Sequence, residues 1–249
     1  MSADCVLNNW RVDVVSGSEY FPVSYGFLYN WYAATDARNI CAEGWRVPLI
    51  SDWLILCLYL DPDADYGEYG ETNYYMDSNF AGGKLKELGE VYWNNPNVGA
   101  TNEVGFNGKG SGWRGYDYGF FYDLKVINVL WAGDSTLGFS EVYFINSDTY
   151  FNATNYNDAN YDTFKRYGLS IRPVKDSTTL TNGQTGTYTG NDGKVYRTIC
   201  IGTQEWLADN LAETKYRNGD DIPEVTDDGA WAALDTGAMC AYNNDWNNV

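Results

Sequence analysis

Apolar and polar residues alternate in two short segments of the C-terminal half of the chain. These segments are residues 169–174 (LSIRPV) and 194–201 (KVYRTICI), and their period of two predicts half-buried β-strands. Between them lies the polar, Thr- and Gly-rich stretch 176–192 (DSTTLTNGQTGTYTGND), which reads as a linker. The pattern predicts that the two strands pair as an antiparallel hairpin across this linker.

Helical patterns are few and short. Residues 51–60 (SDWLILCLYL) form the best amphipathic candidate, with Ser51 as its N-cap, and residues 228–234 form a second candidate capped by Asp228. Residues 81–88 add one or two further turns, and turn dipeptides such as Asn107-Gly108 recur along the chain. We therefore expect a mixed α+β domain of small, twisted antiparallel sheets with two short helices and extensive loops.

The charge balance argues against several classes of function, among them nucleic-acid binding. The 249 residues carry a formal net charge of −18 and include no histidine. Such a chain repels nucleic acid and anionic membrane surfaces, and it lacks the side chain used in most nucleophile pairs and zinc sites. No apolar run approaches the length of a membrane span, and no secretory signal is visible. We expect neither nucleic-acid binding nor membrane insertion, and we expect binding rather than catalysis.

Aromatic residues gather in one window of the chain, residues 113–167. There Tyr, Phe and Trp alternate with a similar density of Asn and Asp. Tyr with Asn, Asp, Ser and Gly is the mixture used by antibody loops, which combine rigid anchors with adaptable hydrogen-bonding groups. A twisted sheet with polar turns would also be rich in Tyr and Phe. Composition leaves both interpretations open.

One acidic loop has the spacing of a calcium site. Asp61, Asp63 and Asp65 stand at alternate positions, as in the first half of an EF-hand loop. However, Gly67 falls one place late, and Thr72 stands where the closing Glu is expected. We therefore expect no cofactor and interpret this segment as a solvated acidic loop, with a calcium site as the alternative.

The cysteines form no framework that the sequence can identify. Cys5, Cys41, Cys57, Cys200 and Cys240 are odd in number and contain no C-x-x-C pair. We interpret them as small buried thiols. With 34 acidic residues, hydrolysis by paired carboxylates stays an alternative, although no spacing singles out a pair.

Several longer motifs carry a family resemblance. They are YGFLYNWYAA (25–34), CAEGWRVP (41–48), AGGKLK (81–86), ATNEVGF (100–106), GWRG (112–115) and YGLSIRPV (167–174). In these segments the chain resembles the Fibrobacter succinogenes major paralogous domain family. The tail segments GKVY (193–196), IGTQEW (201–206), DNL (209–211) and GAMCAYNND (237–245) resemble the opening part of the same family.

The resemblance implies a C-type-lectin-like fold in a circularly permuted order. The chain then divides into an N-terminal extension (1–24), the main part of the domain (25–175), a linker (176–192) and a permuted segment (193–249) that completes the domain. Lectin-like folds pair their first and last strands, so a short loop suffices to join them. Alternatively, the tail completes a neighbouring chain's domain and gives a strand-swapped homo-oligomer.

Within the family motifs, the tryptophans and arginines have expected structural roles. Trp31, Trp45, Trp53 and Trp206 are expected in the core. Arg46, Arg114 and Arg172 are expected to brace loops by bonding carboxylates or carbonyls.

Lectin-like domains of this kind also resemble the variable proteins that retroelements diversify in phages and bacteria. The resemblance implies a variable window between GWRG (112–115) and GLSIRP (168–173). The expected ligand contacts in that window are Tyr116, Asp117, Tyr118, Tyr122, Asp123, Asp134, Asn146, Asp148, Tyr150, Asn152, Asn155, Tyr156, Asn157, Asn160 and Tyr161.

The function expected from these observations is non-catalytic binding or adhesion. The partner would be a host-surface protein or a glycan, and the protein would sit on a virion, as a phage receptor-binding protein, or at the cell surface. The alternative is a bacterial surface protein of the same family with a structural or carbohydrate-binding role.

Overall fold

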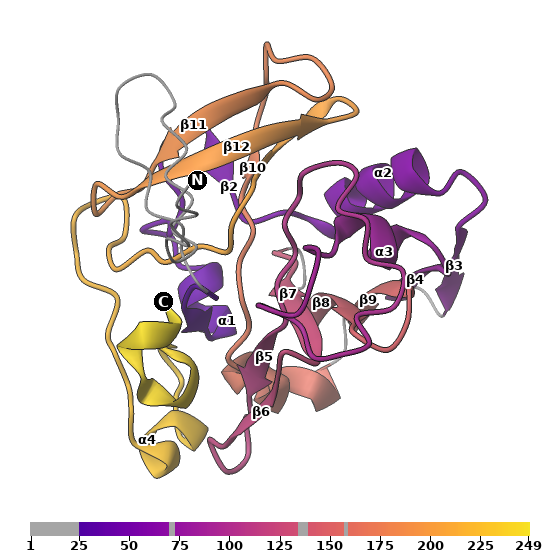
Figure 1. Cartoon of the computed structure of the whole chain (residues 1–249). Helices are drawn as coiled ribbons and strands as arrows, with labels where there is room; N and C mark the ends of the chain where they lie inside the picture. Colours follow the sequence, from indigo (N-terminus) through magenta and orange to yellow (C-terminus); the bar gives the residue numbers. More distant parts are fainter. Residues whose placement is uncertain (1–24, 70–72, 134–138, 157–158) are drawn as a thin grey trace, which may run out of the picture.

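The computed structural model describes residues 25–249 except 70–72, 134–138 and 157–158. The described chain is a mixed α+β structure of mostly β-sheet, as the sequence predicts (Figure 1). The helices are α1 (Trp31–Ala34), α2 (Ile50–Leu60), α3 (Ala81–Leu85) and α4 (Asp228–Ala232), with 3-10 turns η1 (Ala159–Arg166), η2 (Tyr242–Asn244) and η3 (Trp246–Asn248). The strands are β1 (Leu28–Tyr29), β2 (Trp45–Arg46), β3 (Asp65–Tyr69), β4 (Asn73–Ser78), β5 (Ser111–Arg114), β6 (Phe121–Leu124), β7 (Ile127–Trp131), β8 (Phe139–Ile145), β9 (Phe151–Tyr156), β10 (Val174–Lys175), β11 (Thr185–Thr189), β12 (Val195–Ile201), β13 (Gln204–Leu207) and β14 (Met239–Cys240).

The largest sheet has seven strands in the order β3-β4-β9-β8-β7-β5-β6. Its pairs are antiparallel except for the parallel pair β5–β7. Helices α2 and α3 lie against one face of this sheet (Figure 1). The side chains that point towards them are apolar, because side chains on a strand alternate between the two faces.

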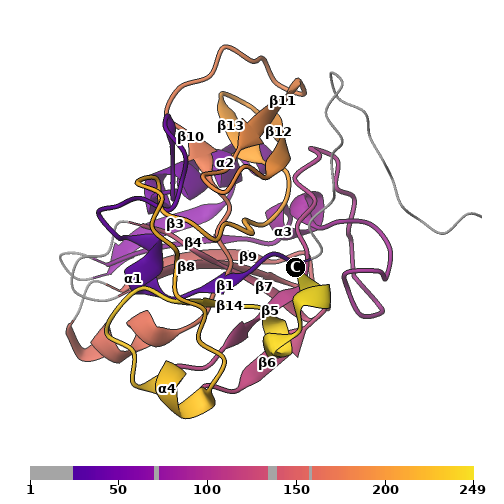
Figure 2. The same cartoon turned by 90° about the vertical axis from the view of Figure 1, so that its left-hand side faces the viewer.

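A five-stranded sheet, β11-β12-β13-β10-β2, occupies the opposite end of the molecule from α4 (Figure 2). Here the predicted hairpin is wrong. Strand β10 pairs with β13 and β2, whereas β12 pairs with β11, which lies inside the stretch predicted to be a linker. The alternation of Thr with Gly and Tyr in β11 was the missed signal, since it buries Tyr188 against Tyr196.

The C-terminal segment pairs within its own chain. Strand β14 pairs with β1, so that Leu28 lies opposite Cys240, and Val174 of β10 lies opposite Trp206 of β13. The backbone N–H of Tyr25 also donates to the carbonyl of Asn248 at 2.9 Å. The first and last described parts of the chain therefore lie side by side.

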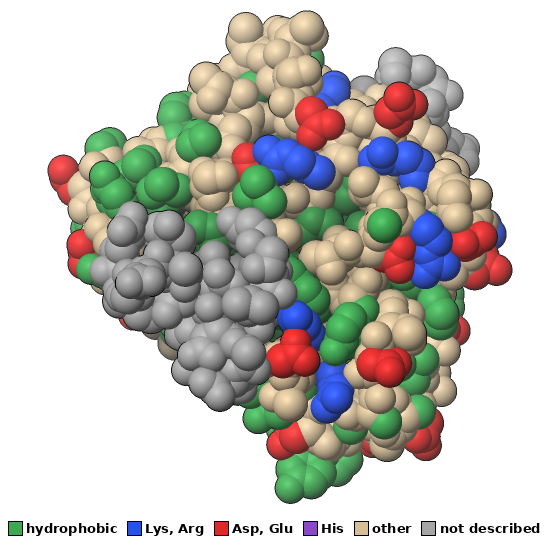
Figure 3. Space-filling view, turned by 180° about the vertical axis from the view of Figure 1, so that it is seen from behind, with side chains coloured by type: hydrophobic (Ala, Val, Ile, Leu, Met, Phe, Trp, Pro, Cys, Tyr) green, Lys and Arg blue, Asp and Glu red, His purple; other side chains and the backbone are tan. Residues whose placement is uncertain are grey.

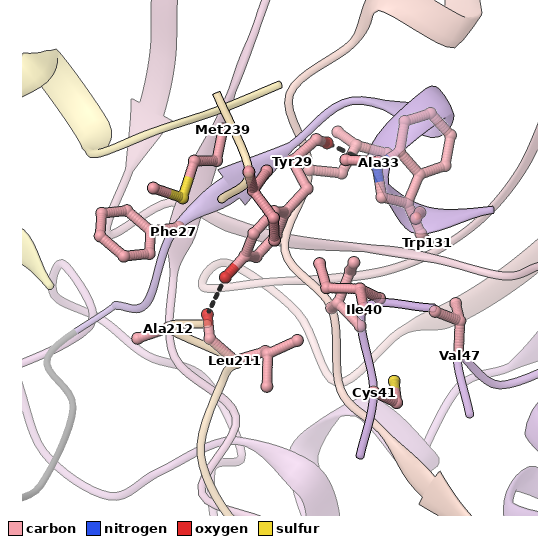
Figure 4. Close-up of a cluster of buried hydrophobic side chains, with 14 of the residues drawn as sticks. Phe27, Tyr29, Ala33, Ile40, Cys41, Val47, Trp131, Leu211, Ala212 and Met239 are labelled. Atoms are coloured by element: carbon pink, nitrogen blue, oxygen red, sulfur yellow. Dashed lines mark hydrogen bonds between the residues drawn. The ribbon is translucent and has the colours of Figure 1, made fainter. Parts of the chain in front are cut away.

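Two large apolar clusters fill the interior. One contains Phe27, Tyr29 and Trp131, and Figure 4 shows the Tyr29 hydroxyl pointing at the Leu211 carbonyl while the Trp131 indole donates to the Tyr29 carbonyl at 2.7 Å. The other contains Trp53 and Trp206 and lies between the seven-stranded sheet and helices α2 and α3. Residues of the C-terminal segment contribute to both clusters, so the main part and the tail share one interior.

The two predicted helices and the predicted turns at residues 81–88 exist, whereas α1 was not predicted. The caps of the two predicted helices differ from the prediction. Helix α2 begins after Leu49, whose backbone N–H donates to the Asp52 carboxylate at 2.7 Å, and Ser51 lies within the first turn. Helix α4 is capped by Asp227, which accepts a hydrogen bond from the Ala230 N–H at 2.8 Å, rather than by Asp228. Both caps still satisfy N–H groups that a helix start leaves unpaired.

The expected structural roles of the motif side chains are confirmed. Trp31, Trp45, Trp53 and Trp206 are buried, and Cys41, Cys57, Cys200 and Cys240 are buried free thiols. Cys5 lies outside the described residues. The described helices include none with both the length and the hydropathy needed to cross a membrane.

Candidate functional site

The two faces of the seven-stranded sheet differ in character, and the candidate site lies on the more polar one. On β8, Val142 and Phe144 point to the side of α2 and α3, and Glu141 and Tyr143 point to the other side. We call this second side the polar face, and its members are Tyr75, Asp77, Glu141, Tyr143, Asn152 and Thr154.

Strand register aligns these residues in rows. Tyr143 lies opposite Asn152 on β9 and opposite Val129 on β7. Glu141 lies opposite Thr154 on β9 and opposite Trp131 on β7. Side chains directly opposite each other in an antiparallel pair are close enough to contact, so the members of the polar face adjoin one another across β4, β9 and β8. On β7 the face ends at Val129 and Trp131, which are buried in an apolar cluster.

A hydrogen-bonded cluster occupies one part of this face. The Asp77 carboxylate accepts from the Tyr150 hydroxyl at 2.5 Å and from the Asn152 amide at 2.6 Å. Burial, followed by the bond to Asp77, raises the pKa of Tyr150 well above its usual value. The Tyr150 ring lies 6.1 Å from that of Tyr143, which links the cluster to the centre of the face.

Beside Tyr143 the surface is hollowed into a cavity of about 210 Å³. The described residues that line it are Trp113, Ile127, Val129, Glu141, Tyr143, Tyr167 and Leu169. Burial raises the pKa of Glu141 to about 7, and no neighbouring cation offsets this rise. The cavity thus combines apolar and aromatic walls with one carboxylate whose charge is poorly solvated.

The connection between β5 and β6, residues 115–120, is rich in aromatic side chains, and we call it the aromatic loop. It follows Trp113, which lines the cavity. Trp113 stacks on Tyr122 with ring centroids 4.5 Å apart, and its indole N–H donates to Asp123 at 2.9 Å. Further along, Tyr118 and Phe120 stack on each other and are 65% and 51% exposed. Large aromatic side chains that are this exposed provide contact area for a partner.

Buried hydrogen bonds of Arg114 stabilise the aromatic loop. Its guanidinium is fully buried and donates to the carbonyls of Gly119 (2.8 Å), Val225 (2.6 Å) and Thr226 (3.0 Å), and to the Asp228 carboxylate (3.0 Å). Two of the predicted bracing arginines behave similarly, because Arg172 donates to backbone carbonyls and Arg46 pairs with Asp52. The C-terminal segment therefore supports the loop through Arg114.

The structure brings only some of the predicted contact residues together. Tyr116, Asp117, Tyr118, Tyr122 and Asp123 lie on the aromatic loop and its flanking strands. Tyr150 and Asn152 belong to the Asp77 cluster.

Two predicted contacts lie apart from these groups. Asn146 is buried and donates to the Asn94 carbonyl at 3.2 Å. The backbone carbonyl of Asp148 accepts from the ammonium of buried Lys86 at 2.6 Å. Both belong to a turn that the loop around Lys86 stabilises.

For the remaining predicted contacts the structure describes only the backbone or does not describe the residue. The backbones of Asn155 and Tyr156 lie on β9, and those of Asn160 and Tyr161 lie on η1. Asp134 and Asn157 lie outside the described residues.

Glu141 is the residue of this site that sequence reasoning missed. Trp113, Tyr143 and Tyr167 were recognised as part of the aromatic window but not as cavity walls. The available signal was the alternation in residues 139–145 (FSEVYFI), which puts Glu141 and Tyr143 on one side of a strand and Val142 and Phe144 on the other.

The calcium candidate is not assembled. Asp61 follows the last residue of α2, and its carboxylate accepts a hydrogen bond from the Ser78 hydroxyl at 2.6 Å. Asp65 is already part of the extended strand β3. Among the described residues, no group of three or more Cys, Asp or Glu side chains is arranged to hold a metal ion. An EF-hand loop must curl around its ion, and a chain that enters a strand after four residues does not.

The surface seen from behind carries charges of both signs. Figure 3 shows Lys and Arg side chains next to Asp and Glu side chains, without a single extended positive area on that face. Elsewhere in the described part of the chain, Arg38 pairs with Asp36 (2.8 Å) and Lys165 pairs with Asp162 (2.7 Å).

Comparison with known protein families identifies the class. Residues 8–175 match the Fibrobacter succinogenes major domain, which is more than half of the chain. The protein therefore belongs to the Fibrobacter succinogenes major domain family, as the motifs indicated. The match ends at residue 175, directly before the stretch that the sequence predicted to be a linker. Comparisons with curated proteins and with solved structures gave no match.

Proposed function

We propose that this protein is a non-catalytic ligand-binding module whose contact surface consists of the polar face and the adjoining aromatic loop. The observation that carries the proposal is the cavity and its neighbours. Trp113 and Tyr143 line the cavity, Trp113 stacks on Tyr122 beside the aromatic loop, and the ring of Tyr143 lies 6.1 Å from that of Tyr150 in the Asp77 cluster. Tyr and Trp supply rigid contact area, and Asn and Asp supply directional bonds, so the combination suits recognition.

The scaffold for this surface is a C-type-lectin-like domain in permuted order. The pairing of β1 with β14 and of β10 with β13 supports this interpretation, because both join the main part to the tail. The same pairs could form between two chains, which would give a swapped dimer. Native mass spectrometry at micromolar concentration separates the two arrangements, since the proposal of a self-contained domain requires a monomer.

The partner class that we propose is a host-surface protein or glycan, bound by a phage receptor-binding protein that a retroelement diversifies. The Tyr, Asn and Asp content of the window supports this view. The nucleotide sequence beside the gene tests it. A near-identical repeat that differs mainly at adenines is expected there, whereas a longer reading frame with an export signal would favour a bacterial surface protein.

The binding proposal has a direct test with two matched variants. Tyr118→Ala combined with Tyr122→Ala removes aromatic area from the loop, and Tyr66→Ala removes a tyrosine that is 61% exposed on β3 and points away from the polar face. Binding of the purified protein to intact bacterial cells and to a glycan array is measured by saturation. We expect the double variant to lose at least about tenfold in affinity and Tyr66→Ala to lose nothing.

Equal binding by the double variant and the wild type, with both folded by circular dichroism, would overturn this proposal. Turnover of a bound glycan that disappears when one Asp or Glu is replaced would instead indicate a hydrolase.

A further inference from the structure

The cavity beside Tyr143 is too small for a typical cofactor or drug-sized molecule. Its volume is about 210 Å³, and sites for such ligands usually range from about 300 to 1,000 Å³. A cavity of this size accommodates one side chain or a group of similar bulk. Its occupant can therefore be argued from the chemistry of the walls.

The walls favour a cation. Three aromatic side chains, Trp113, Tyr143 and Tyr167, line the cavity together with the aliphatic residues Ile127, Val129 and Leu169. The faces of aromatic rings carry negative charge density and attract ammonium groups, and aliphatic walls fit the methylene stem of such a group. An anion would meet the same negative ring faces and would be repelled.

Glu141 supplies the complementary charge. Among the described residues the structure gives no ion pair or hydrogen bond to its carboxylate. The side chain is half-buried, and this burial raises the pKa of Glu141 to about 7. The charged groups of η1, which packs against β8, are engaged elsewhere, since Lys165 pairs with Asp162 and Arg166 donates to the Leu234 carbonyl at 2.8 Å. A half-buried carboxylate without a counter-charge is unfavourable, and a bound cation would reduce that penalty.

We propose that this cavity binds an organic ammonium group, namely the side chain of a lysine that the partner presents. The inference rests on the proposed binding function and names the chemistry that the polar face recognises. The net charge of −18 adds a long-range attraction for a basic partner. Glu141 would meet the ammonium group, and Trp113, Tyr143 and Tyr167 would surround its stem.

The probe for this site is n-butylammonium chloride, which reproduces the end of a lysine side chain. Its neutral counterpart 1-butanol controls for apolar binding, and methyl α-D-glucopyranoside controls for a sugar site. Binding is followed through the indole N–H resonance of Trp113 and the carboxyl ¹³C resonance of Glu141. We expect saturable binding of butylammonium with a dissociation constant on the order of 1 mM and no saturable shift with either control.

Glu141→Gln removes the charge while keeping the shape, and Glu43→Gln removes an exposed carboxylate as the matched control. We expect Glu141→Gln to weaken butylammonium binding at least about tenfold and Glu43→Gln to leave it unchanged. In the wild type the probe should also lower the Glu141 pKa, a measurement that needs no variant. Retained binding in a folded Glu141→Gln protein, or an unchanged Glu141 pKa, would overturn the proposal.

The binding should also depend on pH in a defined direction. The cation prefers ionised Glu141, so its affinity falls as the pH drops below about 7, by about tenfold between pH 8 and pH 6. Tyr143 and Tyr167 are the other ionisable groups of the cavity, and burial keeps the pKa of Tyr167 far above this range. Asp117 also acts on Tyr167. Binding of the probe that is constant across this range would exclude Glu141 as the cation's partner.

These results are independent of the cell-binding test. Loss of cell binding in the Tyr118→Ala, Tyr122→Ala protein without any butylammonium binding would keep the proposed function and refute the lysine pocket. Binding of the glucoside instead of butylammonium would refute the pocket's cation preference in favour of a sugar.

Discussion

Two places in the molecule hold a carboxylate largely away from bulk water, and they do so in different ways. Between the tail and the main part, Asp209 lies 2.9 Å from the ammonium of Lys109, and both side chains are almost fully buried. On the polar face, Glu141 has no described counter-charge. The first arrangement stabilises the packing between the tail and the main part, and the second leaves a charge available for a ligand.

The face of the seven-stranded sheet towards α2 and α3 is apolar, and truncating a side chain there should lower the free energy of unfolding more than a truncation on the polar face. Phe144→Ala removes a fully buried ring that packs near Trp93 and Phe106, and we expect a loss of about 3–5 kcal/mol in the free energy of unfolding. Tyr143→Ala changes the adjacent residue on the polar face and should cost less than about 2 kcal/mol. Urea denaturation of the two variants measures both values, and equal losses would contradict the distinction between the faces.

We expect the second largest effect on stability from the buried ion pair between Lys109 and Asp209. Asp209→Leu removes the carboxylate that lies 2.9 Å from the buried Lys109 ammonium, and we expect a loss of about 3 kcal/mol in the free energy of unfolding. Burial already lowers the pKa of Lys109 to about 7, so the remaining charge is poorly tolerated. In Lys109→Met combined with Asp209→Leu, most of the stability should return. If the double variant is no more stable than Asp209→Leu in thermal denaturation, the pair is not the source of the loss.

Glu141→Gln should have a smaller effect with a characteristic pH dependence. The folded-state pKa of about 7 exceeds the unfolded value of about 4.5, so the folded protein binds the extra proton between these values. This contribution to stability is fully present below pH 4.5 and is lost as the pH rises through 7. We expect Glu141→Gln to be more stable than the wild type at pH 8, by about 1–3 kcal/mol, and the difference to shrink towards pH 5. A difference that grew at low pH would reverse the assignment.

The exposed aromatic pair should have the smallest effect on stability. Tyr118→Ala combined with Phe120→Ala removes two rings that contact mainly each other and solvent. We expect the free energy of unfolding to stay within about 0.5 kcal/mol of the wild type. A larger loss in guanidinium denaturation would show that these rings serve the fold rather than a partner.

Local patterns in the sequence predicted the elements that depend on neighbouring residues. The apolar face of α2, the buried tryptophans of the family motifs and the bracing role of Arg114 follow from residue type and spacing. Strand partners do not, because pairing is decided by contacts between distant segments. Strand β12 could have paired with β10, and only the burial of Tyr188 against Tyr196 favours β11.

The candidate site could also be predicted only in part from local sequence patterns. The aromatic window was visible as composition, but composition does not tell which side of a strand a residue occupies. Glu141 lies in the site because its strand register places it opposite Trp131 and Thr154. Asn146 was predicted to contact the ligand, but its amide donates to the Asn94 carbonyl, away from the site. The carboxylates at Asp61, Asp63 and Asp65 kept the spacing of a calcium loop without its curvature.

The hydrogen bonds of Arg114 have a consequence for the order of folding. This arginine joins the aromatic loop to residues 225–228, more than a hundred positions later in the chain. Contacts of such high sequence separation form late, because a long stretch of chain must be ordered before they are made. During synthesis the loop therefore lacks its support until residues 225–228 have left the ribosome. A nascent chain would not hold the proposed contact surface in its final form before that point.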